Sequence, residues 1–330
     1  MEFLGRRAVV AGAAAGVLGA LAGCGSGRGS GGAGSPSAAA SSASASAASA
    51  SAAALPAATA WAPSSNDIDP LVKLRAVQLI EALGSWSTGQ QGLAAARGRV
   101  AALGLDPALA AQAGPLLSSA PRAVVQVAEA QYGGILSSTA SVLVVCRQWT
   151  QDAAGTVVPG GTTVDVRLSQ ADPRWTVTAL HPAEPGAAAA ALPAAARQVL
   201  ASPEITLPPA AEADIRSGNV HTSALDALLT LARSYRLQLS VVRSGHPIDV
   251  FGTDRPSDHP RGRAFDVWSV DGHDVVDPAT SRPLVEGLMR AAAAAGSYNV
   301  GGPWQLSGGA PDQFFTDATH HDHVHVGFDF

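Results

Sequence analysis

Apolar residues recur at helical spacing in the segment that begins near residue 64. Leucine, valine and isoleucine return every three or four positions over 68–83, which predicts an amphipathic helix. Further helical patterns follow at 91–103, 107–117 and 121–130. Strands rich in β-branched residues are then predicted at 141–149, 162–168 and 175–180. Residues 64–183 are therefore expected to form an accessory α+β unit, in which helices precede an antiparallel meander.

A second α+β unit is expected over 197–330, after an Ala/Pro-rich linker at 184–196. Helices are predicted at 223–236 and 283–295, and strands at 237–242, 263–270 and 323–328. The expected architecture is a small antiparallel sheet with helices.

The amino terminus has the pattern of an export signal. Arg6 and Arg7 precede 16 residues without charge, a run shorter than a membrane-spanning helix requires. The run ends in the motif LAGC at 21–24, which resembles a bacterial lipobox. The resemblance implies a signal peptide over 1–24 and a lipid anchor at Cys24, on the extracytoplasmic face of the plasma membrane. An ordinary signal peptide with an incidental cysteine is the alternative, and twin-arginine and general secretion both stay open.

Composition narrows the possible partners. Residues 25–63 are almost all Gly, Ser and Ala, so we expect a disordered tether. The 330-residue chain has a net charge of −5 and a single lysine, Lys73, with no long basic run, so no nucleic-acid partner is expected. Two cysteines exclude a disulfide scaffold and a four-cysteine zinc site, and Cys146 is expected to be a buried apolar residue. The oligomeric state stays open.

Candidate chemistry lies in the second unit, since eight of the nine histidines fall within 221–330. In the segment SDHPRGRAFD, His259 and Asp266 are seven residues apart, with Gly262 at the turn between them. His323 and His325 face the same way on the last predicted strand, because strand side chains alternate. Two imidazoles and one carboxylate leave one coordination position open, which is the arrangement of catalytic zinc.

Ser-x-His-x6-Asp, followed much later by Asp-x-x-His or His-x-His, resembles the zinc D-Ala-D-Ala carboxypeptidase family of peptidoglycan peptidases over 197–330. The resemblance implies a Zn²⁺-dependent hydrolase that acts on peptide bonds of stem peptides, without distinguishing a carboxypeptidase from an endopeptidase. It implies His259, Asp266 and His325 as zinc ligands, with Ser257 supporting the first of them.

The same resemblance implies catalytic roles. Asp322 takes the acid/base position, with His323 ranked close behind, and Arg243 polarises the scissile carbonyl. Arg243 precedes His259 by only 16 residues, so a more open cleft than in the dipeptidases of the family is expected. Asp322 falls on the opposite face of a regular strand from His325, so it reaches the site only if the strand begins after it. His323 needs no such break.

These assignments have alternatives. In the alternative interpretation, His259 is an ordinary loop histidine and Asp266 is a surface acid. The terminal histidines then form a solvated cluster, and Arg243 pairs with a surface acid. His246, His273, His320 and His321 are assigned to loops.

Two other functions compete with the peptidase. One is a non-catalytic, zinc-containing lipoprotein that binds the cell wall. The other places function in the accessory unit, as a module for a ligand or partner, and requires a large apolar pocket within 64–183. The order of helices before a sheet in that unit resembles the nuclear-transport-factor-2-like fold.

Overall fold

The computed structural model describes residues 54–330. The predicted signal peptide, Cys24 and the predicted tether as far as residue 53 lie outside the described residues. Within 54–330, no helix is both long and apolar enough to cross a membrane. This part of the chain has the expected α+β class and is built on two sheets.

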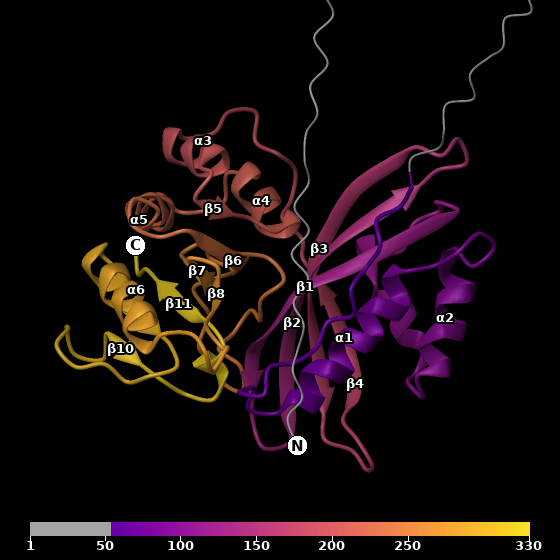
Figure 1. Ribbon diagram of the computed structural model, residues 1–330, viewed down its shortest axis with the longest axis horizontal. Helices are drawn as coiled ribbons and strands as arrows, with labels where there is room; N and C mark the ends of the chain where they lie inside the picture. The colour runs from indigo at the N-terminus through magenta and orange to yellow at the C-terminus, as the bar shows by residue number, and fades with distance from the viewer. Residues whose placement is uncertain (1–53) are drawn as a thin grey trace, which may run out of the picture. The chain divides into compact units, whose positions relative to one another are not determined.

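Four consecutive antiparallel strands form the N-terminal sheet, in the order β1-β2-β3-β4 (Figure 1). Their bounds are Arg122–Ile135 for β1, Thr139–Gln151 for β2, Val157–Ser169 for β3 and Thr176–Pro182 for β4. The expected meander is confirmed. The predicted helix at 121–130 is wrong, because buried Ala123, Val125 and Val127 alternate with more exposed residues along β1.

Helix α1, Pro70–Gly84, packs on β1 and β2, and α2, Gly92–Ala102, packs beside α1. The pattern at 107–117 forms two short 3₁₀ helices instead of one α-helix, because Gly114 and a proline interrupt it: η1 at Pro107–Gln112 and η2 at Gly114–Leu116. These elements and the sheet enclose one apolar core, in which Cys146 is buried as expected.

A bulge in β1 decides which side chains this sheet presents on its other face. The pairing with β2 skips one residue between Val127 and Glu129, and the extra residue reverses the alternation of the strand. Tyr132 therefore continues the core face, whereas Glu129 and Gln131 are buried on the opposite face.

The C-terminal sheet has the order β10-β9-β11-β7-β6-β5, and β8 also pairs with β7. The bounds are Ile205–Thr206 for β5, Leu237–Val241 for β6, Ala264–Val270 for β7, His273–Asp274 for β8, Asn299–Gly301 for β9, Phe314–Phe315 for β10 and Val324–Gly327 for β11. The sheet is mixed, which corrects the predicted antiparallel sheet. Strands β5 and β6 run parallel because two helices connect them, and β9 and β10 are also parallel.

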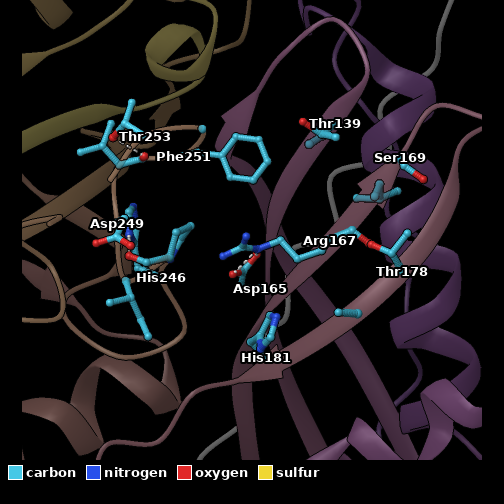
Figure 2. Close-up of a pocket in the computed structure, with 17 residues that line it drawn as sticks. Thr139, Asp165, Arg167, Ser169, Thr178, His181, His246, Asp249, Phe251 and Thr253 are labelled. Atoms are coloured by element: carbon cyan, nitrogen blue, oxygen red, sulfur yellow. Dashed lines mark hydrogen bonds and ion pairs between the residues drawn. The ribbon is translucent and has the colours of Figure 1, made fainter. Parts of the chain in front are cut away.

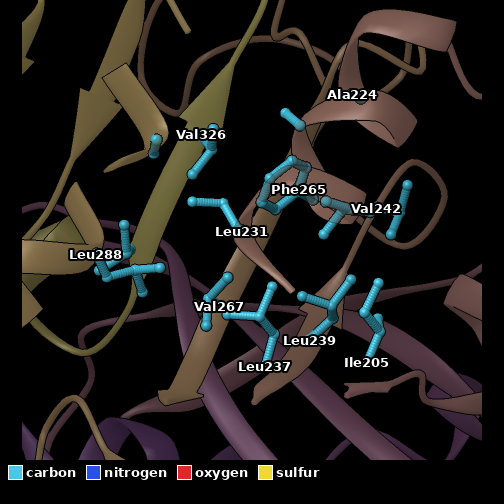
Figure 3. Packing of buried hydrophobic residues seen from close by; sticks show 14 of the residues in the cluster. Ile205, Ala224, Leu231, Leu237, Leu239, Val242, Phe265, Val267, Leu288 and Val326 are labelled. Atoms are coloured by element: carbon cyan, nitrogen blue, oxygen red, sulfur yellow. The ribbon is translucent and has the colours of Figure 1, made fainter. Parts of the chain in front are cut away.

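Four helices contribute to the core on one face of this sheet: α3 at Ala194–Ala201, α4 at Pro209–Arg216, α5 at Thr222–Leu231 and α6 at Arg282–Ala294. Figure 3 shows Phe265, Val267 and Val326 in this core. Because strand side chains alternate, Asp266 and His325 lie on the other face, where they are direct neighbours across β7 and β11. Both sheets belong to one compact unit, and this second face meets β1.

The last part of the predicted tether is ordered, so the predicted disorder of residues 54–63 is wrong. The Thr59 backbone N–H donates to the side chain of Gln126 on β1 at 2.7 Å, and Trp61 packs on the N-terminal core. Trp61 supplies the apolar surface that the Ala/Ser sequence lacks. In the predicted linker, α3 begins at Ala194, and Ala196 is buried in the C-terminal core.

Gly262 forms the turn that links His259 to β7. Its φ of 71° lies in the left-handed region, and its N–H donates to the His259 carbonyl at 2.8 Å. A Cβ atom at this position would lie 2.1 Å from the Asn219 carbonyl oxygen. The turn therefore requires glycine both for its conformation and for space.

We expect Gly262→Ala to lower the free energy of unfolding by more than the about 1–2 kcal/mol of a left-handed alanine alone, because the Asn219 carbonyl must also move. Gly272→Ala is the matched control, since Gly272 has a φ of 82° but nothing lies within 4 Å of its added Cβ. Urea unfolding of both variants measures the difference. Equal losses would contradict the close contact at Gly262.

Candidate metal centre

Three side chains bring one donor atom each to a common point on the face of the C-terminal sheet that meets β1. His259 Nε2 lies 3.1 Å from Asp266 Oδ1 and 3.1 Å from His325 Nδ1, and the last two atoms are 2.9 Å apart. We call these three atoms the donor triangle. They belong to the three residues predicted as ligands from the sequence. All three residues are buried, and His325, at 8 % exposed, is the least so and lines a cavity.

The His259 ring is oriented so that Nε2 is the nitrogen that faces the other two donor atoms. Its Nδ1 lies 3.0 Å from the Val242 carbonyl oxygen, which can only accept, so Nδ1 carries the proton of the neutral ring. Nε2 then faces the Asp266 carboxylate oxygen, acceptor to acceptor, at 3.1 Å. This contact is repulsive unless a proton or a cation lies between the two atoms. An N–H to carbonyl contact on the far ring nitrogen is also the usual support of a metal-binding histidine, so the donor set fits a metal ion.

The size of the donor triangle fits as well. A tetrahedral ion with bonds of about 2.0–2.1 Å holds its ligand atoms about 3.3–3.4 Å apart, so the three atoms need to spread only slightly. His246 forms an overlapping His/His/Asp group with His259 and Asp266, whose donor atoms all lie within 4.8 Å of one another. Its ring stacks on that of His259 at a centroid distance of 4.1 Å. His246 lies in a loop, as expected, yet it adds a third imidazole to the site.

Asp266 is oriented by the N-terminal sheet. Gln131 Nε2 donates to Asp266 Oδ2 at 2.6 Å, and the Gln131 side-chain oxygen accepts from the Ser240 hydroxyl. Because Oδ2 is occupied, Oδ1 is the oxygen left for the donor triangle. Burial alone would raise the pKa of Asp266, but His259 and His323 hold it well below its usual value. The carboxylate is therefore ionised and fixed.

Ser257, predicted to support the first ligand, lies beside His259. Its hydroxyl oxygen is 3.4 Å from the His259 backbone nitrogen and 3.4 Å from His246 Nδ1. Ser257 is buried, so it contacts both histidines away from solvent.

Asp322 lies before β11, which begins at Val324, so strand alternation does not keep it from the site. Both of its oxygens are nonetheless bound. Oδ1 lies 2.6 Å from His323 Nδ1, and Oδ2 accepts from the Tyr132 N–H at 3.0 Å and lies 2.7 Å from Lys73 Nζ. Burial would raise the pKa of Asp322, but Lys73 and the His323 hydrogen bond hold it at about 2. Asp322 is therefore an anion that orients His323.

His323 is the member of this pair that faces the donor triangle. Because Nδ1 points to Asp322, Nε2 is directed to the other side, where it lies 3.7 Å from Asp266 Oδ2. Burial would lower the pKa of His323, but Asp266 and Asp322 together raise it above its usual value. An imidazole oriented in this way can hold and release a proton at a defined place.

Lys73 balances the negative charge of this region. It lies on α1, is fully buried, and its Nζ binds both Asp67 and Asp322. Burial alone would lower the pKa of Lys73, but the carboxylates of Asp322, Glu129 and Asp67 raise it. The only lysine of the chain therefore connects α1 to Asp322, which lies three positions before the predicted ligand His325.

Arg243 is not brought into the cluster. Its Nη1 lies 3.3 Å from the Pro185 carbonyl oxygen and 3.6 Å from Asp214 Oδ1, and its backbone N–H donates to Asp214 Oδ2 at 3.1 Å. The acid is Asp214 of α4, which is fully buried. An acid partner for Arg243 was the alternative that the sequence offered, although that acid is buried instead of exposed.

A cavity of about 440 Å³ opens beside the donor triangle and is lined by His246, His320, His323 and His325, among others. His320 belongs to the short helix η3, Thr319–His321. Its Nδ1 lies 2.8 Å from Asp317 Oδ1, and its ring is 5.2 Å from the ring of His323. A second Asp–His pair therefore borders the same cavity.

Four residues of this region were not predicted as parts of the site: Gln131, Lys73, His246 and His320. Two of them carried a signal in the sequence. Lys73 occupies the apolar stripe of its helix with Ala76 and Ile80, where a charge requires a buried partner. Asp317 precedes His320 by three residues, a spacing that allows contact on one turn. Gln131 had no such signal, because the β1 bulge decides its face.

Comparisons with known proteins identify no relative. No protein-family model matches the chain, and searches of curated proteins and of solved structures return no significant match. The functional argument therefore depends on the residues of the site.

Lys73→Met is expected to lower the free energy of unfolding by about 3–5 kcal/mol, because it removes the buried cation that Asp67 and Asp322 share. Arg216→Met is the control. It breaks an ion pair with Glu212 in which the side chains are 53 % and 44 % exposed, and such a pair contributes below about 1 kcal/mol. Denaturant unfolding measures both variants. A loss in Lys73→Met no larger than that of the control would mean that the buried carboxylates do not depend on Lys73.

Proposed function

We propose that this chain is a zinc-dependent peptidase that hydrolyses peptide bonds in the stem peptides of peptidoglycan. The observation that carries the proposal is the donor triangle of His259, Asp266 and His325, next to a cavity of about 440 Å³ that His325 lines. Two nitrogens and one carboxylate oxygen are a ligand set of catalytic zinc, in which a fourth position stays open. The motif at 21–24 supports a lipid anchor at Cys24 and a place in the cell envelope.

Zinc held by these ligands would supply a Lewis acid and lower the pKa of a bound water. The chain's own residues would move the proton. His323 Nε2 takes it from the attacking water and returns it to the leaving amine, while Asp322 holds Nδ1 of the same ring. The sequence ranked Asp322 first for this role. His323 is the better candidate, because both Asp322 oxygens are already bound.

His320 is the candidate for stabilising the oxyanion, in place of Arg243. The Arg243 guanidinium is engaged by Asp214 and the Pro185 carbonyl. His320 is held by Asp317 through Nδ1, so its Nε2 donates a hydrogen bond at the cavity only when both ring nitrogens carry a proton. A positioned donor at developing negative charge is a common source of transition-state stabilisation.

For residues 64–183 we propose a nuclear-transport-factor-2-like fold, supported by the order of helices before the antiparallel meander. In the peptidase, this part of the chain would act as a support of the site. Gln131 fixes Asp266, and Lys73 with the Tyr132 N–H fixes Asp322.

A non-catalytic zinc lipoprotein that binds the cell wall is the second candidate. His246 is the observation that favours it, since a fourth protein ligand would close the coordination sphere as in structural zinc sites. The two candidates differ in a measurable way, because only the peptidase releases product from a stem peptide.

Metal content tests the donor triangle. The wild-type protein is expected to retain one equivalent of zinc after dialysis, and the His259→Ala/His325→Ala double variant to lose it, since Asp266 alone remains of the triangle. His273→Ala is the control, because His273 is exposed on β8, outside the cluster. Elemental analysis gives the stoichiometry. Tight stoichiometric zinc in the double variant would refute the assignment.

Turnover of a synthetic stem pentapeptide tests the proton-transfer role. His323→Gln is expected to keep zinc and fold but to lower the rate by about 10²–10⁴-fold, the usual contribution of a positioned acid/base. Asp322→Asn should also lower the rate of hydrolysis. The Asp322→Asn/His323→Gln double variant should be no slower than His323→Gln alone, because Asp322 acts through His323.

His321→Gln is the matched control for that series, since His321 stands in the same histidine run and does not line the cavity. Wild-type rates in His323→Gln would show that another residue moves the proton. If fully zinc-loaded wild-type protein releases no peptide, the wall-binding lipoprotein is the correct function.

A further inference from the structure

A second cavity, of about 790 Å³, adjoins the candidate metal centre and extends over the N-terminal sheet. One wall is formed by residues of β2, β3 and β4, and the other by the loop at 246–253 (Figure 2). Both cavities are lined by His246, Val250 and Phe251. A ligand at the donor triangle can therefore extend past His246 onto the N-terminal sheet.

This second cavity lies between the two halves of the chain, and its lining is not purely apolar. A ligand-binding module within 64–183 would instead require an apolar pocket formed by that part of the chain alone. Figure 2 shows Arg167 of β3 reaching from the sheet into the cavity, beside Asp165 and across from His246.

Asp165 binds the Nε edge of the Arg167 guanidinium and holds the side chain in place. Its Nε lies 2.8 Å and 2.7 Å from the two oxygens of Asp165, which is buried and also accepts from the Ser141 hydroxyl at 2.6 Å. The Phe251 ring packs against the guanidinium, with its centroid 5.3 Å from Cζ. The two Nη atoms have no hydrogen-bond partner among residues 54–330.

An arginine anchored through Nε presents its two Nη atoms as a planar fork, and this fork matches the two oxygens of a carboxylate. Asp165 and Phe251 already restrict the side chain, so a ligand need not order it. Asp165 also balances much of the positive charge, and Asp249 lines the same cavity. This balance favours a single carboxylate over a polyanion.

We propose that Arg167 is a carboxylate-binding subsite for the peptide on which the metal centre acts, so that the substrate class is a peptide with a free carboxylate away from the scissile bond. The inference rests on the proposed peptidase function. In a stem peptide, this carboxylate is either the carboxy terminus or the internal carboxyl group of the γ-linked glutamyl residue. The two share one chemistry and differ in their position along the peptide.

Equilibrium binding to the metal-free protein tests the subsite without turnover. Calorimetry would compare three forms of the pentapeptide L-Ala-γ-D-Glu-L-Lys-D-Ala-D-Ala: unmodified, with the internal carboxyl group as the carboxamide, and with the carboxy terminus as the carboxamide. One of the two carboxamides is expected to bind about 10- to 100-fold more weakly to the wild type, the range of a charge-assisted bidentate contact. That carboxamide identifies the source of the carboxylate.

Arg167→Lys is the decisive variant, because it keeps a cation beside the buried Asp165 but removes the fork. Arg167→Lys should lower the affinity for the unmodified peptide by the same factor. It should bind the identified carboxamide with the same affinity as the wild type. Arg147→Gln is the control, since Arg147 lies on the neighbouring strand β2 and does not line the cavity. Unfolding midpoints of all variants verify the fold.

The proposal is overturned if Arg167→Lys binds the unmodified peptide with wild-type affinity, or if the substitution lowers the affinity for all three peptides equally. It is also overturned if the wild type binds none of the peptides. Hydrolysis by the zinc-loaded wild type is measured separately on the same peptides. Carboxylate-dependent binding without hydrolysis supports the subsite and refutes the peptidase. Hydrolysis with no difference between wild type and Arg167→Lys supports the peptidase and refutes the subsite.

Discussion

Between β1 and the C-terminal sheet, carboxylates are buried where water cannot solvate them, and their partners come from the opposite half of the chain. Asp266 accepts from Gln131, and Asp322 is bound by Lys73 and by the Tyr132 N–H. An ionised carboxylate left unpaired in such a place costs several kcal/mol. The contacts that allow these acids to be buried are therefore the same contacts that orient the candidate site.

This arrangement gives the N-terminal half two separate connections to the proposed chemistry. Through Gln131 and Lys73 it fixes the ligand Asp266 and the Asp322–His323 pair from behind. Through Arg167 it lines the cavity that adjoins the donor triangle at His246. A peptide bound at the triangle would thus contact both sheets, so neither half alone would form the complete site.

The three residues of the donor triangle were predicted from the resemblance of their motif to a peptidase family. The turn at Gly262 that places His259 near Asp266 is local, whereas Asp266 and His325 become neighbours only when β7 pairs with β11. The α+β class and the meander followed from the pattern of apolar residues.

Features that depend on contacts between distant segments could not be predicted. The β1 strand was taken for a helix, since its alanine and valine residues suit both patterns until the sheet forms. Asp322 appeared free for catalysis because its partner Lys73 lies on the first helix.

Anomalous X-ray diffraction at the zinc edge, from crystals of the zinc-loaded protein, tests the central claim most directly. The account predicts one strong peak at bonding distance from His259 Nε2, Asp266 Oδ1 and His325 Nδ1, with a non-protein ligand on the side of the cavity. A peak that lacks these three ligands, or a closed shell that includes His246 as the fourth ligand, would contradict a catalytic metal centre.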